Sequence, residues 1–188
     1  MRAFVAIELN EEVRASLVEV QHSLRAWSKT ARWVDPKQLH LTVKFLGDVP
    51  DEDVPVIVEA MGEAASVGAE FELTLLGAGC FPPKGPVRIV WVGASNADGA
   101  MDRLVESSEA SLEPLGFPRE DRSFSPHLTI GRVREDASGG KLREAVGRVS
   151  VNSVTQRVSA LTLMSSELSP QGPKYAVVHR AALGAGTA

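Results

Sequence analysis

The chain has 188 residues, of which 44% are apolar and 23% charged, and its net charge is −4. This composition is ordinary for a soluble globular protein, and it excludes the global basic surface that attracts duplex nucleic acid. A nucleic-acid end stays open as a substrate, because a few local groups can hold it.

Hydrophobic spacing and helix-capping residues predict alternating strands and helices. The helix after the first strand begins at Asn10, a good N-cap, and carries an apolar stripe from Val13 to Trp27. The expected strands are 4–7, 39–46, 71–76, 87–92, 127–133, 153–164 and 175–180, and the expected helices are 11–27, 53–66, 97–115 and 141–148.

This order predicts an α+β fold with antiparallel sheets, because short turns as well as helices join the strands. We expect one bilobal domain over residues 1–182 with pseudo-twofold symmetry, two sheets flanking a central cleft and helices outside. Residues 183–188 are expected to form a disordered tail. The single cysteine, Cys80, excludes an internal disulfide. With no signal peptide or membrane span, we expect a cytoplasmic protein and no membrane partner.

The most informative feature is a short phrase that occurs twice, His40-Leu41-Thr42-Val43 and His127-Leu128-Thr129-Ile130. Residues two apart on a strand point to the same face, so each copy places an imidazole beside a hydroxyl group. Two such pairs across one cleft would supply a proton acceptor, a proton donor and two hydroxyl groups. That combination suits phosphoryl transfer without a metal.

The segments around these phrases carry a family resemblance. His40 to Gly47 and Ser125 to Arg132 resemble the two signatures of the two-histidine (2H) phosphoesterases. The opening Met1 to Ile7 and the late Leu168 to Tyr175 are similar to one branch of them, the LigT-like RNA 2′,3′-cyclic phosphodiesterases. The resemblance therefore runs from residue 1 to about residue 180.

The resemblance implies a bilobal fold around a water-filled cleft. It also implies a hydrolase that converts a terminal 2′,3′-cyclic phosphate of RNA into a 2′-phosphomonoester, with no metal and no cofactor. Some relatives run the chemistry in reverse, as ATP-independent 2′-5′ RNA ligases. The implied partners are RNA 3′ ends bearing a cyclic phosphate, or cyclic nucleotides.

The residues of the two phrases fit this chemistry. One of His40 and His127 would take a proton from water while the other protonates the leaving oxygen, because imidazole titrates near neutral pH. The sequence does not say which does which. Thr42 and Thr129 would donate hydrogen bonds to phosphate oxygens. Arg132 is a further candidate phosphate ligand, although strict alternation turns it away from His127 unless a bulge at Gly131 re-aims it.

Other polar and aromatic residues receive less specific interpretations. Lys44 is in phase with His40 and either lines the cleft or is solvated. Trp33 and Phe45 could stack a base, but Phe45 is out of phase and is expected in the core. The remaining expectations are a buried structural Cys80, a solvated His22, a structural His179 and a solvated acidic helix face at Glu106, Glu109 and Glu113.

Two alternatives stay open beside the RNA-terminal phosphodiesterase. The cleft could act on a small nucleotide-derived cyclic phosphate, which the acidic net charge favours slightly. It could also bind RNA ends or nucleotides without catalysis. We expect a monomer, because no long exposed apolar pattern is visible.

Overall fold

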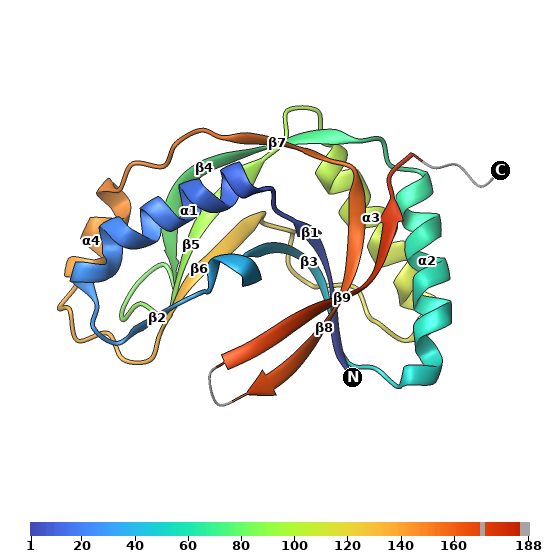
Figure 1. Cartoon of the computed structure of the whole chain (residues 1–188), viewed down its shortest axis with the longest axis horizontal. Coiled ribbons are helices and arrows are strands. Elements are labelled where there is room, and N and C mark those ends of the chain that lie inside the picture. Colours follow the sequence, from blue (N-terminus) through green and yellow to red (C-terminus); the bar gives the residue numbers. More distant parts are fainter. Residues whose placement is uncertain (170–171, 185–188) are drawn as a thin grey trace.

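The structure, a computed structural model, describes residues 1–169 and 172–184 (Figure 1). Its elements, with 3-10 helices marked η, are β1 (Arg2–Glu8), α1 (Glu11–Leu24), η1 (Arg25–Trp27), β2 (Ala31–Trp33), η2 (Pro36–Gln38), β3 (His40–Asp48), η3 (Asp51–Asp53), α2 (Val54–Ser66), β4 (Phe71–Phe81), β5 (Ile89–Ser95), α3 (Ala100–Leu112), η4 (Glu113–Leu115), β6 (His127–Val133), α4 (Lys141–Arg148), β7 (Thr155–Val158), β8 (Ala160–Ser169) and β9 (Gly172–Ala182). None of the helices in these described residues combines the length and the apolarity that crossing a bilayer requires.

The strands form two antiparallel sheets, which confirms the predicted α+β class. One sheet has the order β3-β1-β8-β9 and packs against α2 and α3; the other has the order β2-β6-β5-β4-β7 and packs against α1 and α4 (Figure 1). Each lobe takes strands from both halves of the chain, since β1 and β9 share a sheet. The two lobes therefore do not coincide with the two halves of the sequence.

The two motif strands meet where the lobes join. β3 is the edge strand of the four-stranded sheet, β6 lies second in the five-stranded sheet, and the two strands are in contact. Leu41 on β3 and Leu128 on β6 are both fully buried, in one apolar core that includes residues of both sheets. The shared core holds the two motifs in a fixed relation.

The first helix begins as predicted and ends earlier. The Asn10 side chain accepts a hydrogen bond from the Val13 N–H at 2.8 Å, and the stripe from Val13 to Leu24 is buried. At Arg25 the α-helix gives way to the 3-10 turn η1, which rotates Trp27 out of the stripe. Trp27 is 47% exposed, so its expected place on the buried face of the helix is wrong.

Two expectations near the end of the chain are also wrong. The expected strand 153–164 is divided at Ser159, because β7 pairs in the five-stranded sheet and β8 in the four-stranded one. Leu183 is buried, and its N–H donates to the Ser159 carbonyl at 2.9 Å, so it belongs to the packed fold rather than to a tail. Residues 185–188 lie outside the described residues, as do Pro170 and Gln171 of the family-like phrase.

Candidate active site

The four motif side chains line one large cleft between the lobes. His40, Thr42, His127 and Thr129 are all half-buried on its wall, while the leucine between each pair points into the core. The cleft has a volume of about 1520 Å³. The strand alternation expected from the two phrases is therefore present in both copies.

Both histidine rings are held by the same hydrogen bond. His40 Nδ1 lies 2.7 Å from the carbonyl oxygen of Gln38, and His127 Nδ1 lies 2.7 Å from that of Ser125, two residues earlier in each case. A carbonyl oxygen can only accept, so each Nδ1 must carry the proton. This leaves Nε2 of each neutral ring as the basic atom, available to exchange a proton with a substrate.

Aromatic rings fix the two imidazoles from the side. His40 packs against Phe4 and Tyr175, with ring centroids 4.7 and 5.0 Å apart, and His127 packs edge-on against Phe81 at 5.3 Å. Burial lowers the pKa of His40 below its usual value, and the positive charge of Arg132 lowers it further, against the Gln38 hydrogen bond. His40 is therefore held neutral at neutral pH.

A β-bulge after the first motif reverses the alternation of β3. Ala6 of β1 is opposite Thr42, but the next residue, Val5, is opposite Lys44, so Val43 is the extra residue. Beyond this point Phe45 faces the cleft and is 66% exposed. The expectation that Phe45 packs in the core is wrong for this reason.

The same bulge follows the second motif. Trp91 of β5 is opposite Thr129 and Val90 is opposite Gly131, which leaves Ile130 as the extra residue. The shift turns Arg132 into the cleft, on the same wall as Thr129. A Cβ at Gly131 would lie 2.9 Å from the Trp33 ring, so glycine allows that ring to pack on the strand.

The carbonyl of the bulged Ile130 is well held. It accepts hydrogen bonds from the Gln21 side-chain amide at 2.9 Å and from the Val34 N–H at 3.0 Å. Gln21 is 1% exposed and lies on α1. The orientation of Arg132 therefore rests on a buried polar contact for which the local sequence contains no signal.

Lys44 contributes to the cleft lining, but its side chain is buried rather than solvated. It is 2% exposed, and its ammonium donates to Glu109 Oε2 at 2.5 Å and to the Pro118 carbonyl at 2.7 Å. Glu109 is buried too, so its expected place on a solvated acidic face is wrong. The neighbouring acids are exposed and both bind Arg119, Glu106 at 2.6 Å and Glu113 at 2.9 Å.

The Pro118 contact ties down a loop that reaches the second motif. Residues 119–125, between η4 and β6, line the cleft and end at Ser125, whose carbonyl holds His127. Spacing alone could not reveal this loop. Tyr175 was also missed as a cleft residue, although it is the only tyrosine in the chain and closes the family-like phrase. Burial raises the pKa of the Tyr175 hydroxyl, which keeps it protonated.

The other two histidines and the cysteine do not contribute to the cleft lining. His22 is exposed, as expected, and His179 is half-buried on β9 outside the cleft lining. Cys80 is buried, and burial raises the pKa of its thiol, which fits a structural side chain. Trp33 lines the cleft from β2. The described residues contain no group of three histidine, cysteine or carboxylate side chains close enough together to hold a metal ion.

Comparison with known proteins identifies relatives of the whole chain. A family model described as LigT like Phosphoesterase matches residues 7–91 and again residues 92–175. A protein of Methanothermobacter thermautotrophicus called RNA 2′,3′-cyclic phosphodiesterase is 35% identical over 93% of this chain and 95% of its own length. A Thermus thermophilus protein with the same name is 36% identical over 97% and 90%.

Solved structures agree in fold and in extent. The Thermus thermophilus protein TT0787 superposes with a TM-score of 0.84 at 35% identity, covering 98% of both chains. E. coli LigT complexed with 3′-AMP superposes with a TM-score of 0.73 at 27% identity, covering 97% of both. The family model matches once around each motif, and the relatives are similar over nearly their full length. The chain therefore belongs to the LigT-like phosphoesterase family.

Proposed function

We propose that this protein is an RNA 2′,3′-cyclic phosphodiesterase, which hydrolyses a terminal 2′,3′-cyclic phosphate to a 2′-phosphomonoester. The observation that carries this proposal is the matched pair of histidines in one cleft. Each has Nδ1 bound to the carbonyl two residues earlier and a threonine hydroxyl beside it on the same strand face. The names of the relatives supply the class of substrate.

In the proposed reaction, His40 acts as the base and His127 as the acid. His40 Nε2 takes a proton from water, the water oxygen attacks phosphorus, and the P–O3′ bond breaks on the far side. The departing O3′ receives a proton from Nε2 of His127, which enters this step doubly protonated, with its Nδ1–H held by the Ser125 carbonyl. His40 suits the first step because burial and Arg132 keep it neutral. Proton exchange with solvent returns both rings to their starting states.

The remaining cleft groups act on the phosphate oxygens. Negative charge on the two non-bridging oxygens grows as water attacks. The Thr42 and Thr129 hydroxyl groups donate hydrogen bonds to these oxygens, and the Arg132 guanidinium adds a positive charge beside them. These three side chains therefore stabilise the transition state more than the ground state, which is the condition for catalysis.

The size of the cleft favours an RNA end over a small cyclic nucleotide. Its volume of about 1520 Å³ exceeds the range of about 300–1,000 Å³ that is usual for small-molecule sites. Solved structures of E. coli LigT contain 3′-AMP or ATP, so a cleft of this fold accepts nucleotides. Reversal of the same steps would re-form the cyclic phosphate from a 2′-phosphate and the 3′-hydroxyl of the same ribose. In the ligase reaction, a 5′-hydroxyl of a second RNA attacks the cyclic phosphate in place of water and forms a 2′-5′ bond.

The test uses an RNA oligonucleotide with a 2′,3′-cyclic phosphate, incubated with the protein in EDTA. We expect a 2′-phosphate product from the wild type, and a loss of about 10²–10⁴-fold in kcat for His40→Ala and for His127→Ala. His22→Ala is the matched control, because His22 is exposed on α1 and should leave the rate unchanged. Absence of turnover by folded wild type that still binds the RNA end would refute the proposal in favour of a binding module.

A further inference from the structure

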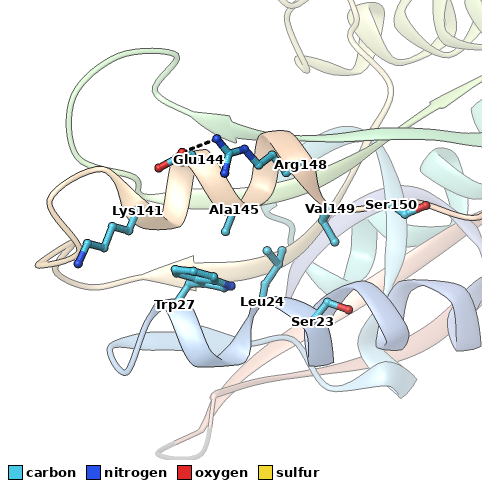
Figure 2. Close-up of a pocket in the computed structure, with 9 residues that line it drawn as sticks. All are labelled: Ser23, Leu24, Trp27, Lys141, Glu144, Ala145, Arg148, Val149 and Ser150. Atoms are coloured by element: carbon cyan, nitrogen blue, oxygen red, sulfur yellow. Dashed lines mark ion pairs between the residues drawn. The ribbon is translucent and has the colours of Figure 1, made fainter.

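A second groove lies on the outside of the five-stranded lobe, between α1–η1 and α4 (Figure 2). It has a volume of about 360 Å³ and shares no lining residue with the catalytic cleft. Leu24 and Trp27 form one side, and Ala145, Arg148 and Val149 form the other. We call it the Trp27 groove.

The groove combines an apolar floor with an exposed aromatic ring. Leu24 is 1% exposed at its base, whereas Trp27 is 47% exposed at its side. Tryptophan is highly buried on average in globular proteins, so an accessible ring beside an apolar surface is a common feature of binding sites. In Figure 2 the Trp27 ring lies below α4, with Lys141 at one end of the groove.

The surface around the groove is basic in a chain that is acidic overall. Residues 25–34 and 132–148 carry eight basic and three acidic side chains, whereas the whole chain has a net charge of −4; two of the eight, Arg32 and Arg132, line the catalytic cleft. Apart from Arg132, five exposed basic residues in these two segments form no ion pair within the described part of the chain. They are Arg25, Lys29, Arg32, Arg134 and Lys141.

The acidic side chains of this surface are engaged locally, with one exception. Glu144 pairs with Arg148 at 2.7 Å, and Asp136 accepts from the Val87 N–H at 2.8 Å and from Ser138. Glu135 is exposed, and its carboxylate forms no ion pair with the described residues. The local excess of positive charge is therefore available to a polyanion.

A direct path joins this surface to the catalytic cleft. Trp27 lies in the groove and Trp33 in the cleft, and the chain between them, which includes β2, spans at most about 20 Å over six residues. β2 is the edge strand of its sheet, so no strand covers it on that side. Arg32, on β2, faces the cleft at one end of the path, and Lys29 lies between the two tryptophans.

We propose that the Trp27 groove binds the RNA strand on the 5′ side of its cyclic phosphate. A base stacks on Trp27, and phosphates contact Lys29, Arg134 and Lys141. Exposed aromatic rings within a basic groove are the usual means of holding single-stranded nucleic acid without reading its sequence. The proposal rests on the proposed function, because it takes the RNA end to lie in the catalytic cleft.

The geometry sets a length requirement. Stacked nucleotides advance by about 3.4 Å each, so a strand needs up to about six nucleotides to reach from the cleft to Trp27. A dinucleotide held in the cleft cannot touch the groove, whereas a ten-nucleotide RNA can. Substitutions in the groove should therefore act on long RNA and leave short RNA unaffected.

The test measures binding of labelled RNA that ends in a 2′-phosphate, so that no turnover is needed. We expect Trp27→Leu to weaken binding of the ten-nucleotide RNA by about tenfold, the effect of losing one stacked base, and to leave dinucleotide binding unchanged. Lys141→Gln should lower the slope of log affinity against log salt by about 0.7, the value for one single-strand phosphate contact. Arg157→Gln is the matched control, since it also removes one positive charge from an exposed side chain. Arg157 lies on β7, outside the groove, and pairs with Glu70.

Two results would overturn the proposal. One is unchanged binding of the ten-nucleotide RNA by a folded Trp27→Leu variant, which would leave the groove to another occupant, such as a protein. The other is equal weakening for both lengths, which would show that Trp27 acts through the fold. If the wild type binds the RNA end without hydrolysing the cyclic phosphate, and Trp27→Leu still weakens only long RNA, the proposed catalysis fails while binding of the strand by the groove stands.

Discussion

Lys44→Met should destabilise the protein far more than the loss of a surface lysine would. The side chains of Lys44 and Glu109 are 2% and 9% exposed, and their charged groups are 2.5 Å apart. Removing one partner of a buried ion pair costs about 3–5 kcal/mol, because the other charge stays buried without compensation. An exposed pair is worth about 0–1 kcal/mol. For a chain of this length, we expect the melting temperature to fall by roughly 6–20 °C.

A second substitution separates the charge effect from packing. Lys44→Met/Glu109→Met replaces both charges by apolar side chains of similar length, which is often neutral or stabilising for a buried pair. The Pro118 carbonyl still loses its donor, which costs about 1 kcal/mol. The double variant should therefore lie within about 2 kcal/mol of wild type and well above Lys44→Met.

Urea unfolding followed by tryptophan fluorescence at pH 7 measures both variants. A loss below about 1 kcal/mol for Lys44→Met, or a double variant no more stable than the single one, would refute the reasoning.

Four further predictions concern residues of the cleft. With a cyclic phosphate whose 3′-oxygen is replaced by sulfur, His127→Ala should recover most of its lost rate, because a thiolate leaves without a proton; recovery by His40→Ala instead would exchange the two roles. The lowered pKa of His40 should place the acid limb of kcat/KM below about pH 6.5, and Arg132→Met should move that limb upward in a pH–rate profile by removing the charge that lowers this pKa. The same shift makes stability fall as pH drops below about 6.5, since the unfolded chain protonates His40 first. Thr42→Val and Thr129→Val should each lower kcat by about a hundredfold with little change in melting temperature. A kcat equal to that of the wild type would contradict contact of that hydroxyl group with the transition state.

The sequence predicted the features that depend on regular periodicity. Alternation alone placed His40 with Thr42 and His127 with Thr129 on one strand face each, and the strand from His127 to Val133 has the predicted bounds. The helix from Lys141 to Arg148 does too. In these segments the side-chain pattern and the backbone geometry have the same period, so local sequence is sufficient.

The bulges show where this reasoning ends. A bulge displaces one residue and reverses the side chains that follow it, yet Val43 has no positive φ that would favour glycine, so the bulge leaves no trace in the sequence. Gly131 did offer a sign, and the expected re-aiming of Arg132 rested on it. Phe45 was therefore misplaced, and the burial of Lys44 was missed, for the same physical reason, the extra residue Val43 in β3.

Other misplacements come from contacts between distant segments. Ser159 separates two strands of different sheets, and the segment from 153 to 164 contains no glycine or proline to mark that change of partner. Glu109 has the spacing of a solvated helix face, and it is buried because Lys44 reaches it from 65 residues away. Pairing of this kind is a property of the tertiary fold and is not encoded in local periodicity.

The matched bulges have a consequence for the direction of cleavage. A 2′,3′-cyclic phosphate presents two nearly equivalent ester oxygens, and the hydrogen bond that holds each histidine ring is the same in both motifs. Selection of the bond must come from groups that differ between the two motif strands. Five residues after each histidine, the bulges bring Phe45 to one wall and Arg132 to the other. An apolar ring on one wall and a guanidinium on the other make the cleft chemically asymmetric, so under the proposed function these two side chains, and not the histidines alone, would bias which ester bond breaks.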